Sequence, residues 1–226
     1  MSELAQKYIP NFLTYKEEFL QSIVETLIML FSSAIFVLIF GLIIGTILVV
    51  TRKGNILENN IIYQIIDKSI NIFRSIPFVI LLTLLIPVTK IVTGTYIGVK
   101  GAIFPLVVGA IPFFVRQVDS ALSDVDKGVL EAAQSMGLSP LEIIVKVYWR
   151  ESIPQLSRAV TITIISLLGL TAMGGAVGGG GIGAFVIRYG HNRNFNDITF
   201  ISVVVILIFV SLIQTIGDIV AKKTKH

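Results

Sequence analysis

The sequence predicts an all-α, polytopic membrane protein with five membrane-spanning helices. Hydrophobic residues make up 54% of its 226 residues and charged residues only 14%, and the mean hydropathy is +0.86. A composition this apolar leaves too little polar side-chain area to cover a soluble globule. Long runs without charge alternate with short connectors that hold most of the Lys and Arg residues, which is the pattern that insertion into a bilayer produces.

The first predicted span is residues 27–50, an uncharged run that ends just before Arg52 and Lys53. At 1.5 Å per residue, a helix of this length crosses the hydrocarbon core with some tilt. The run is longer than the apolar core of a signal peptide, and no small-residue cleavage site follows it, so we expect the span to be retained. Residues 1–22 are polar enough to form a short surface helix. Gly41 and Gly45 form a G-x-x-x-G pair, which we interpret as packing within the chain.

The last two predicted spans are residues 159–177 and 198–217, and neither contains a charge. The two middle spans are shorter. Residues 75–89 and 101–115 are apolar runs of fifteen residues, each bounded by basic residues.

Each of the middle runs contains two prolines, which are Pro77 with Pro87 and Pro105 with Pro112. Short segments interrupted by proline are tolerated where neighbouring helices or a water-filled path satisfy the freed backbone groups. The two runs are therefore either walls of a transport pathway or kinked packing helices.

The distribution of basic residues predicts the orientation of the five spans. With the amino terminus outside and the carboxyl terminus in the cytoplasm, 12 of the 18 Lys and Arg residues face the cytoplasm. These twelve are Arg52, Lys53, Lys68, Arg74, Arg116, Lys127, Lys146, Arg150, Arg158, Lys222, Lys223 and Lys225. This bias agrees with the positive-inside rule, so the loop between the third and fourth spans is cytoplasmic.

That cytoplasmic loop reads as two short helices joined by a tight turn. Residues 126–136 begin with an acidic residue and are followed by Gly137, a residue suited to a left-handed helix cap. Ser139, Pro140 and Glu142 then form an S-x-x-E capping box with proline at the first helical position, which predicts a new helix. The small side chains that precede the turn favour close docking into a groove of another protein, although a merely structural hairpin is the alternative.

Catalysis, metal binding and nucleic-acid binding are disfavoured. The chain has no Cys and two His residues, His191 and His226, which do not suggest a metal site or redox chemistry. The glycines of residues 178–183 lack the Lys of a phosphate-binding loop and are expected to form a flexible turn where a span breaks open. No Asp, Glu or His lies inside the five uncharged cores, which argues against a proton-driven carrier.

The loop motif resembles the EAA loop of ABC-importer permeases. Glu131, Ala132 and Ala133 are followed after three residues by Gly137, as in the coupling helix that those permeases seat in a cleft of their ATPase subunit. Where that family usually has a Leu-Pro pair, this chain has Trp149-Arg150, with Pro154 shortly afterwards. This difference leaves the exit of the second helix open.

Two further stretches resemble the permease subunits of methionine importers, and the resemblance covers about residues 22–223. They are Asn-Ile-Phe-Arg-Ser-Ile-Pro-Phe at 71–78 and Ala-Met-Gly-Gly-Ala-Val-Gly at 172–178. The resemblance implies a type I ABC importer permease in the bacterial plasma membrane, paired with a second copy of itself. It also implies a dimer of cytoplasmic ATPase subunits and an extracytoplasmic substrate-binding protein or lipoprotein that delivers methionine. The permease itself would bind no cofactor, metal or nucleotide, would catalyse no reaction, and would contact membrane lipid.

The resemblance assigns roles to particular residues. Coupling to the ATPase falls to Glu131, Ala132, Ala133, Met136, Gly137, Ser139 and Pro140, and the gate or pathway to Met173, Gly174, Pro77 and Pro112. Methionine is also a common gap-filler in packed helices, so a packing role for Met173 is the alternative. The expected division is an outer segment 1–21, a permease domain 22–215 with the EAA loop at about 126–150, and a cytoplasmic tail 216–226. Another small amino acid or a methionine-containing peptide is the alternative cargo, and an ATP-independent carrier or channel is the alternative class.

The predicted orientation is testable with single introduced thiols, because the chain has no Cys. We expect Ser2→Cys to react with an impermeant thiol reagent in intact cells and Ser139→Cys to react only after the cytoplasmic face is exposed. Labelling of Ser139→Cys in sealed, right-side-out cells contradicts the orientation.

Overall fold

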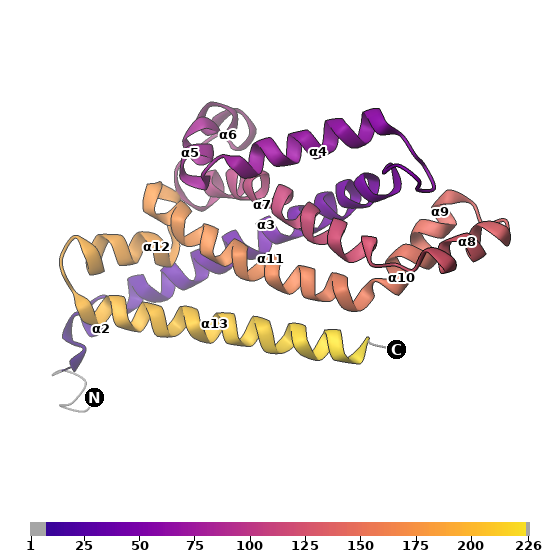
Figure 1. The fold of residues 1–226 in the computed structure, drawn as a ribbon. Helices are drawn as coiled ribbons and strands as arrows, with labels where there is room; N and C mark the ends of the chain where they lie inside the picture. The colour runs from indigo at the N-terminus through magenta and orange to yellow at the C-terminus, as the bar shows by residue number, and fades with distance from the viewer. Residues whose placement is uncertain (1–7, 225–226) are drawn as a thin grey trace. The chain divides into compact units, whose positions relative to one another are not determined.

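The computed structural model describes residues 8–224, and within them the chain is helical with no strand. Residues 1–7, which include Ser2 and the start of the predicted outer segment, and residues 225–226 lie outside the described part. The elements of Figure 1 are α2 (Pro10–Thr14), α3 (Lys16–Val50), α4 (Asn60–Ser75), α5 (Phe78–Leu84), α6 (Ile86–Thr93), α7 (Gly98–Ser123), α8 (Lys127–Ser135), α9 (Pro140–Ile143), η1 (Ile144–Tyr148), α10 (Trp149–Glu151), α11 (Ile153–Gly174), η2 (Gly175–Gly179), α12 (Gly181–Phe185), η3 (Val186–His191) and α13 (Asn196–Lys223), where η marks π-helical turns.

The chain divides into two compact units, each built from three stretches of sequence. Unit 1 takes the residues up to Ile35, Pro77–Gly109 and Ile164–Ile213, and unit 2 takes Phe36–Ile76, Ala110–Thr163 and the residues from Gln214 onward. The long helices α3, α7, α11 and α13 each contribute to both units. The expected domain boundaries at residues 22 and 216 fall inside α3 and α13, and they stay predictions.

Four helices in the described part are long and apolar enough to cross a bilayer: α3, α7, α11 continued through η2, and α13. The fifth predicted span, residues 75–89, consists of the end of α4 and the two short helices α5 and α6, which meet at Leu85. Pro87 lies in the first turn of α6, where the missing N–H costs no internal hydrogen bond. The number of spans and their orientation stay predictions.

All four long spans exceed the runs expected from sequence, and α3 and α7 exceed them most. α3 begins at Lys16 rather than near residue 27, because Glu17 and Glu18 suit a helix amino terminus and Phe19, Ser22 and Thr26 form a buried stripe. α7 runs unbroken for 26 residues through both of its prolines. Pro105 and Pro112 are buried, so packing holds the helix together where each proline removes a hydrogen bond.

The core of unit 1 is an aromatic cluster of Phe19 on α3, Phe185 and Tyr189 near α12, and Ile198 on α13. The first turn of α13 is tied to α2, since the Asp197 carboxylate accepts hydrogen bonds from the Asn11 side chain at 3.1 Å and the Phe12 backbone N–H at 3.0 Å. Figure 1 shows α2 beside the start of α13.

The core of unit 2 joins α3, α4 and α7 through Leu48, Ile70 and Val115. At Gly41 a Cβ atom would come within 2.5 Å of the Phe114 side chain, and at Gly45 within 2.7 Å of the side chain of Val118. The G-x-x-x-G pair therefore lets α3 pack closely on α7, which confirms the intrachain interpretation.

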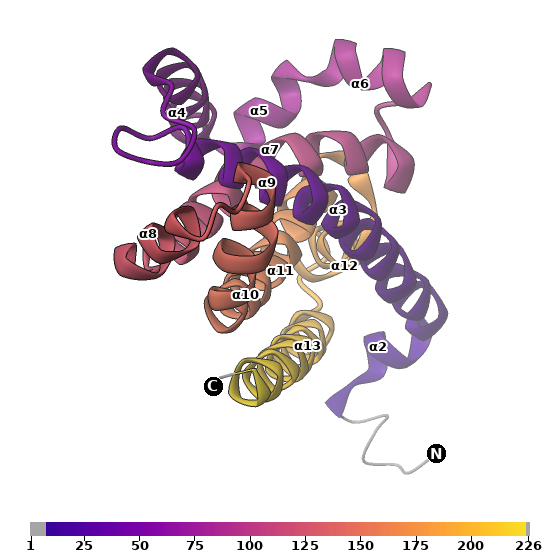
Figure 2. The same cartoon turned by 90° about the vertical axis from the view of Figure 1, so that its right-hand side faces the viewer.

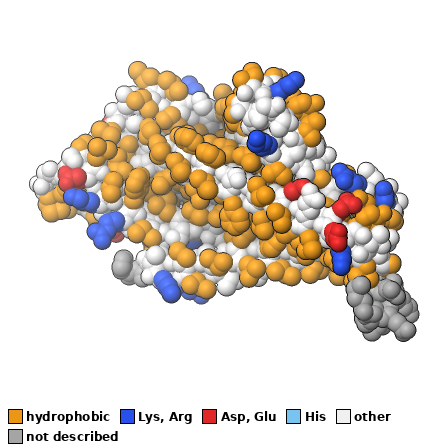
Figure 3. Space-filling model, turned by 180° about the vertical axis from the view of Figure 1, so that it is seen from behind, with side chains coloured by type: hydrophobic (Ala, Val, Ile, Leu, Met, Phe, Trp, Pro, Cys, Tyr) orange, Lys and Arg blue, Asp and Glu red, His pale blue; other side chains and the backbone are white. Residues whose placement is uncertain are grey.

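Large apolar side chains cover much of the outer surface. Hydrophobic side chains dominate the face seen in Figure 3, and the Lys, Arg, Asp and Glu side chains gather in small groups. In the most hydrophobic 18-residue stretch of α13, only 11% of the residues are buried. Phe200, Leu207 and Ile216 on that helix are exposed. An apolar exterior of this extent requires lipid or another apolar protein surface.

Candidate coupling loop and pathway segment

The helix α8 has capped ends that fix both its length and the turn that follows. Asp126 is the N-cap, and its carboxylate accepts the Gly128 N–H. At the other end, the N–H of Gly137 donates to the Gln134 carbonyl at 2.9 Å, and the N–H of Leu138 donates to the Ala133 carbonyl at 3.2 Å. This pair of bonds is a Schellman motif, and Gly137 takes the left-handed conformation it needs with φ of +78°. The predicted helix and cap are confirmed.

The next helix begins with the expected capping box. The Glu142 carboxylate accepts hydrogen bonds from the Ser139 N–H at 3.1 Å and the Ser139 hydroxyl at 2.9 Å, and Pro140 is the first helical residue. Hydrogen bonding to the Lys146 ammonium and to Ser139 holds the pKa of Glu142 at about 2, below its usual range. The carboxylate therefore stays ionised at every physiological pH, and the start of α9 does not depend on pH there.

The loop presents a small apolar surface among polar side chains. Ala133 is buried against the rest of unit 2, whereas Ala132 beside it is exposed. Of the predicted coupling residues, Glu131, Met136, Gly137, Ser139 and Pro140 are also exposed, and Met136 is 73% exposed. Leu141, which was not predicted from sequence, is also 73% exposed. An exposed Met and an exposed Leu thus lie on either side of the fixed turn, and the predicted docking role stays a prediction.

The second helix of the loop continues without a break through the Trp149-Arg150 position. The chain passes from α9 through a π-helical turn, η1, into α10. Two side chains of this stretch bind other segments of unit 2: the Tyr148 hydroxyl donates to Asn55 Oδ1 at 2.6 Å, and Trp149 Nε1 donates to Thr46 Oγ1 at 3.1 Å. Trp149, which departs from the Leu-Pro pattern, thus anchors the loop to α3, and Tyr148 before it anchors the loop to the segment after α3. Figures 1 and 2 show α8, α9 and α10 side by side.

A cluster of charged side chains links the turn after α3 with α4 and α7 in unit 2. The Arg116 guanidinium pairs with Asp67 on α4 and, at 3.3 Å, with Asp119 one turn further along α7. Asp119 also binds Arg52 at 2.6 Å, and Asn71 accepts a hydrogen bond from Arg116 at 2.8 Å. From the sequence, both arginines were predicted only to contribute to membrane orientation. The available signal was the spacing of Asp67 and Asn71, which are four residues apart and so share a helix face.

The predicted gate region in unit 1 is built from backbone packed against backbone. A Cβ atom at Gly175 would lie 2.6 Å from the Ala184 nitrogen and the Gly180 oxygen, and one at Gly183 would overlap the Ala172 carbonyl. The chain therefore folds back on itself between η2 and α12 at a separation that only glycine permits. At the end of α11, Gly174 is buried and Met173 is 42% exposed.

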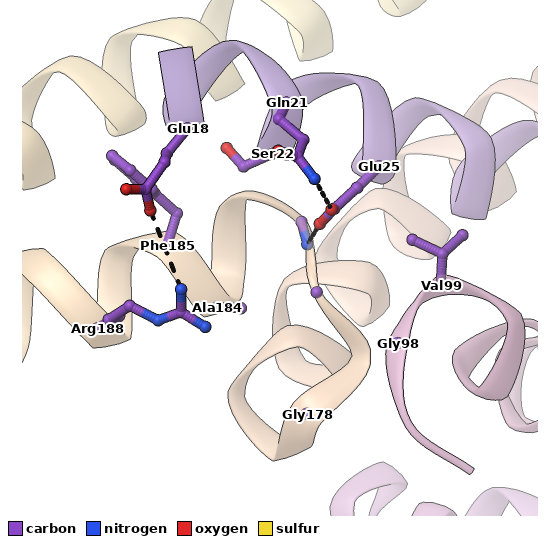
Figure 4. Close-up of a pocket in the computed structure, with 12 residues that line it drawn as sticks. Glu18, Gln21, Ser22, Glu25, Gly98, Val99, Gly178, Ala184, Phe185 and Arg188 are labelled. Atoms are coloured by element: carbon purple, nitrogen blue, oxygen red, sulfur yellow. Dashed lines mark hydrogen bonds and ion pairs between the residues drawn. The ribbon is translucent and has the colours of Figure 1, made fainter. Parts of the chain in front are cut away.

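Side chains of α3 hold this glycine-rich turn. The Glu25 carboxylate accepts the Gly181 N–H at 2.7 Å, and Thr26 Oγ1 accepts the Ile182 N–H at 2.9 Å. The turn also borders a pocket of about 390 Å³ in unit 1. Figure 4 shows Gln21 and Glu25 of α3 on one side of it and Arg188 facing Glu18 on another. This turn was expected to be flexible. In the structure, side chains of α3 bind two of its backbone N–H groups.

The two prolines assigned to the pathway differ in their surroundings. Pro77 is exposed and precedes α5 as its N-cap, whereas Pro112 is buried inside α7 in unit 2. Neither observation tests a role in lining a pathway, so both assignments stay predictions. Among residues 8–224, no group of three His, Asp or Glu side chains is placed to hold a metal ion.

Comparison with known proteins identifies relatives along nearly the whole chain. Residues 37–224 match the family of binding-protein-dependent transport system inner membrane components. The probable D-methionine transport system permease protein MetI of Pasteurella multocida is 45% identical over 205 residues, which cover 91% of this chain and 94% of that protein. The methionine import system permease protein MetP of Bacillus subtilis is 46% identical over 174 residues, which cover 77% of this chain and 78% of that protein.

Solved structures of ABC transporters share the fold of this chain. A chain of the MetNI methionine ABC transporter in an inward-facing conformation superimposes with a TM-score of 0.91 and 40% identity, with full coverage of both chains. A chain of an amino acid ABC transporter crystallised with histidines shares the fold with a TM-score of 0.76 at 17% identity. The expected permease fold is thereby confirmed, and the chain belongs to the family of binding-protein-dependent transport system inner membrane components.

Proposed function

We propose that this chain forms the translocation pathway of an ATP-driven methionine importer. The observation that carries the proposal is the full-length superposition at 40% identity on the permease chain of a methionine ABC transporter. Relatives named as methionine permeases at 45% and 46% identity support the same cargo. The chain is a membrane permease subunit and not an enzyme, because ATP hydrolysis in this class of transporter belongs to a separate subunit.

The assembly we propose contains two copies of this chain, two cytoplasmic ATPase subunits and an extracytoplasmic binding protein. Two copies related by a two-fold axis enclose a path that one copy of a few helices does not. ATP binding closes the ATPase pair, and that closure moves the permease from an inward-facing to an outward-facing state. The binding protein then delivers methionine to the outer mouth.

Coupling to the ATPase is assigned to the loop from α8 to α9. Three features support this role: the turn is held by a Schellman motif at Gly137, the second helix starts at a capping box, and Met136 and Leu141 are exposed. Because the turn between the two helices is fixed by these caps, α8 and α9 move as one rigid body when the ATPase moves. The bonds of Tyr148 and Trp149 transmit that movement to Asn55 and to Thr46 on α3.

Gating of the outer mouth is assigned to Met173 and Gly174. The Met173 side chain is partly exposed at the end of α11, so it is available to meet its counterpart from a second copy. Two thioethers on a symmetry axis plug a path without placing a charge in it.

The cargo and energy source are tested by reconstitution. We expect an ATPase subunit to co-purify with the full-length chain in equal amount, and vesicles holding this complex with its binding protein to accumulate methionine only when ATP is supplied. Accumulation without ATP indicates a carrier or channel instead. ATP-dependent uptake of another amino acid, with none of methionine, contradicts the cargo while leaving the importer class intact.

The coupling role is tested at Gly137, where an added Cβ atom meets no atom within 4 Å and the backbone, with φ of +78°, has a conformation that disfavours other residues. A β-branched residue adopts this conformation at a cost of roughly 1–2 kcal/mol. We expect Gly137→Val to insert normally in the membrane but to weaken ATPase binding by roughly 5- to 30-fold. Gly137→Asn is the matched control, because Asn tolerates a left-handed conformation, and it should stay near the parent. Parent-like assembly and uptake in Gly137→Val count against the coupling role.

The gate is tested by the ratio of ATP hydrolysis to methionine uptake in reconstituted vesicles. Shortening the plug favours the outward-open state, so Met173→Ala should raise hydrolysis without substrate and raise this ratio. Met29→Ala is the control for packing, because Met29 is 0% exposed in the same unit. It should lower thermal stability, by about 2–5 kcal/mol for a fully buried site, and leave the ratio unchanged. If Met173→Ala behaves like Met29→Ala, the residue is a packing residue and not a gate.

A further inference from the structure

A second cavity lies in unit 2, at the ends of α11 and α13, and the proposed transport mechanism does not use it. Its volume is about 580 Å³, and its lining includes Arg150, Glu151, Gln155, Arg158 and Thr224. Figures 1 and 2 show the last turn of α13 beside α10 and the start of α11. Two arginines and one glutamate give the lining a net charge of +1.

The two arginines of this cavity are exposed and differ from the partly buried arginines Arg52 and Arg116 of the same unit in their partners. Arg52 and Arg116 each pair with a carboxylate, whereas neither Arg150 nor Arg158 forms a salt bridge with any residue in the part of the chain that is described. Gln155 also lacks a hydrogen-bond partner, because its buried carbonyl oxygen, Oε1, has no donor among the described residues. A buried acceptor without a donor is costly unless a ligand or water supplies one.

The cavity lies at the level where the apolar surface of these helices ends. On α11 the exposed side chain of Ile162 follows Arg158, and on α13 exposed Ile216 and Val220 precede Lys222. The two helices approach closely here, since a Cβ atom at Gly217 would overlap the Thr161 side chain. A molecule bound in the cavity therefore has cations at one end and an apolar surface beside it. This is the environment of a lipid head group at the membrane interface.

We propose that this cavity binds the phosphate of an anionic phospholipid whose head group carries hydroxyls, such as phosphatidylglycerol. The guanidinium groups of Arg150 and Arg158 bind phosphate oxygens through paired N–H donors, a geometry that suits arginine better than lysine. A head-group hydroxyl donates to Gln155 Oε1, and the acyl chains follow the exposed isoleucines of α11 and α13. Lys222 and Lys223 add positive charge at the end of α13.

The test uses the full-length permease in complex with its ATPase, stripped of lipid in detergent. Native mass spectrometry counts bound lipid while dioctanoyl phosphatidylglycerol is added, and separate titrations use the matching phosphatidylcholine and inorganic phosphate. We expect phosphatidylglycerol to bind, with phosphatidylcholine and phosphate each at least about tenfold weaker.

Two double variants separate this site from general surface charge. Arg150→Gln with Arg158→Gln should weaken binding of phosphatidylglycerol by about tenfold or more. Lys53→Gln with Lys68→Gln removes the same charge from exposed positions of the same unit and should stay within about twofold of the parent. Gln155→Leu should weaken phosphatidylglycerol but leave binding of a methyl-ester head group, which lacks hydroxyls, unchanged.

Several results would overturn the lipid site. Parent-like binding in the double arginine variant excludes these residues, and equal binding of phosphatidylcholine excludes recognition of the anionic head group. Displacement of the lipid by an equal concentration of inorganic phosphate assigns the cavity to free phosphate. If the double arginine variant loses its ATPase, the single variants are measured in its place. Loss of the ATPase from these as well assigns the arginines to the ATPase interface and rejects the lipid site.

Discussion

The need to pair every backbone N–H and C=O group in an apolar medium governs this structure. A continuous helix meets that need internally, and most of the chain is continuous helix. At several interruptions a side chain or a glycine conformation supplies missing partners. Asn59 caps α4, Glu25 and Thr26 bind the N–H groups at the start of α12, and Gly137 closes the end of α8. The last two of these breaks lie in the segments to which we assign gating and coupling.

The sequence predicted best those features whose determinants lie within a few residues. The helix of residues 126–136, its Gly137 cap and the Ser139 capping box depend on local hydrogen bonds, and all three were correct. The expected start of the first long helix was wrong because the polar stretch before residue 27 was interpreted as a separate surface helix. Its charged residues Lys16, Glu17 and Glu18 are exposed in the first turn of α3, and Ser22 and Thr26 on the same helix are buried. The break at Leu85 has no strong local signal except Pro87 two residues later.

Contacts between distant residues could not be read from one sequence. Arg116 and Asp67 are 49 residues apart and Gly181 and Glu25 are 156 apart. The spacing of Asp67 and Asn71 places these two on one helix face, but it does not indicate that Arg116 is their partner. The assignment of the family depended instead on short motifs whose residues are adjacent in the chain. The EAA loop and the Met-Gly-Gly stretch were enough to predict the family, although they do not specify which side chains hold them in place.

The charged cluster of unit 2 has an electrical consequence. Arg52 and Arg116 carry two positive charges, and Asp67 and Asp119 carry two negative charges, so the cluster is neutral as a whole. A single charge that crosses the membrane field exchanges about 2.3 kcal/mol with it per 100 mV. When four balanced charges move together, these contributions cancel. Movement of this cluster as a unit along the membrane normal therefore adds no voltage dependence to a conformational change, and the energy of ATP is not converted into electrical work at this point of the protein.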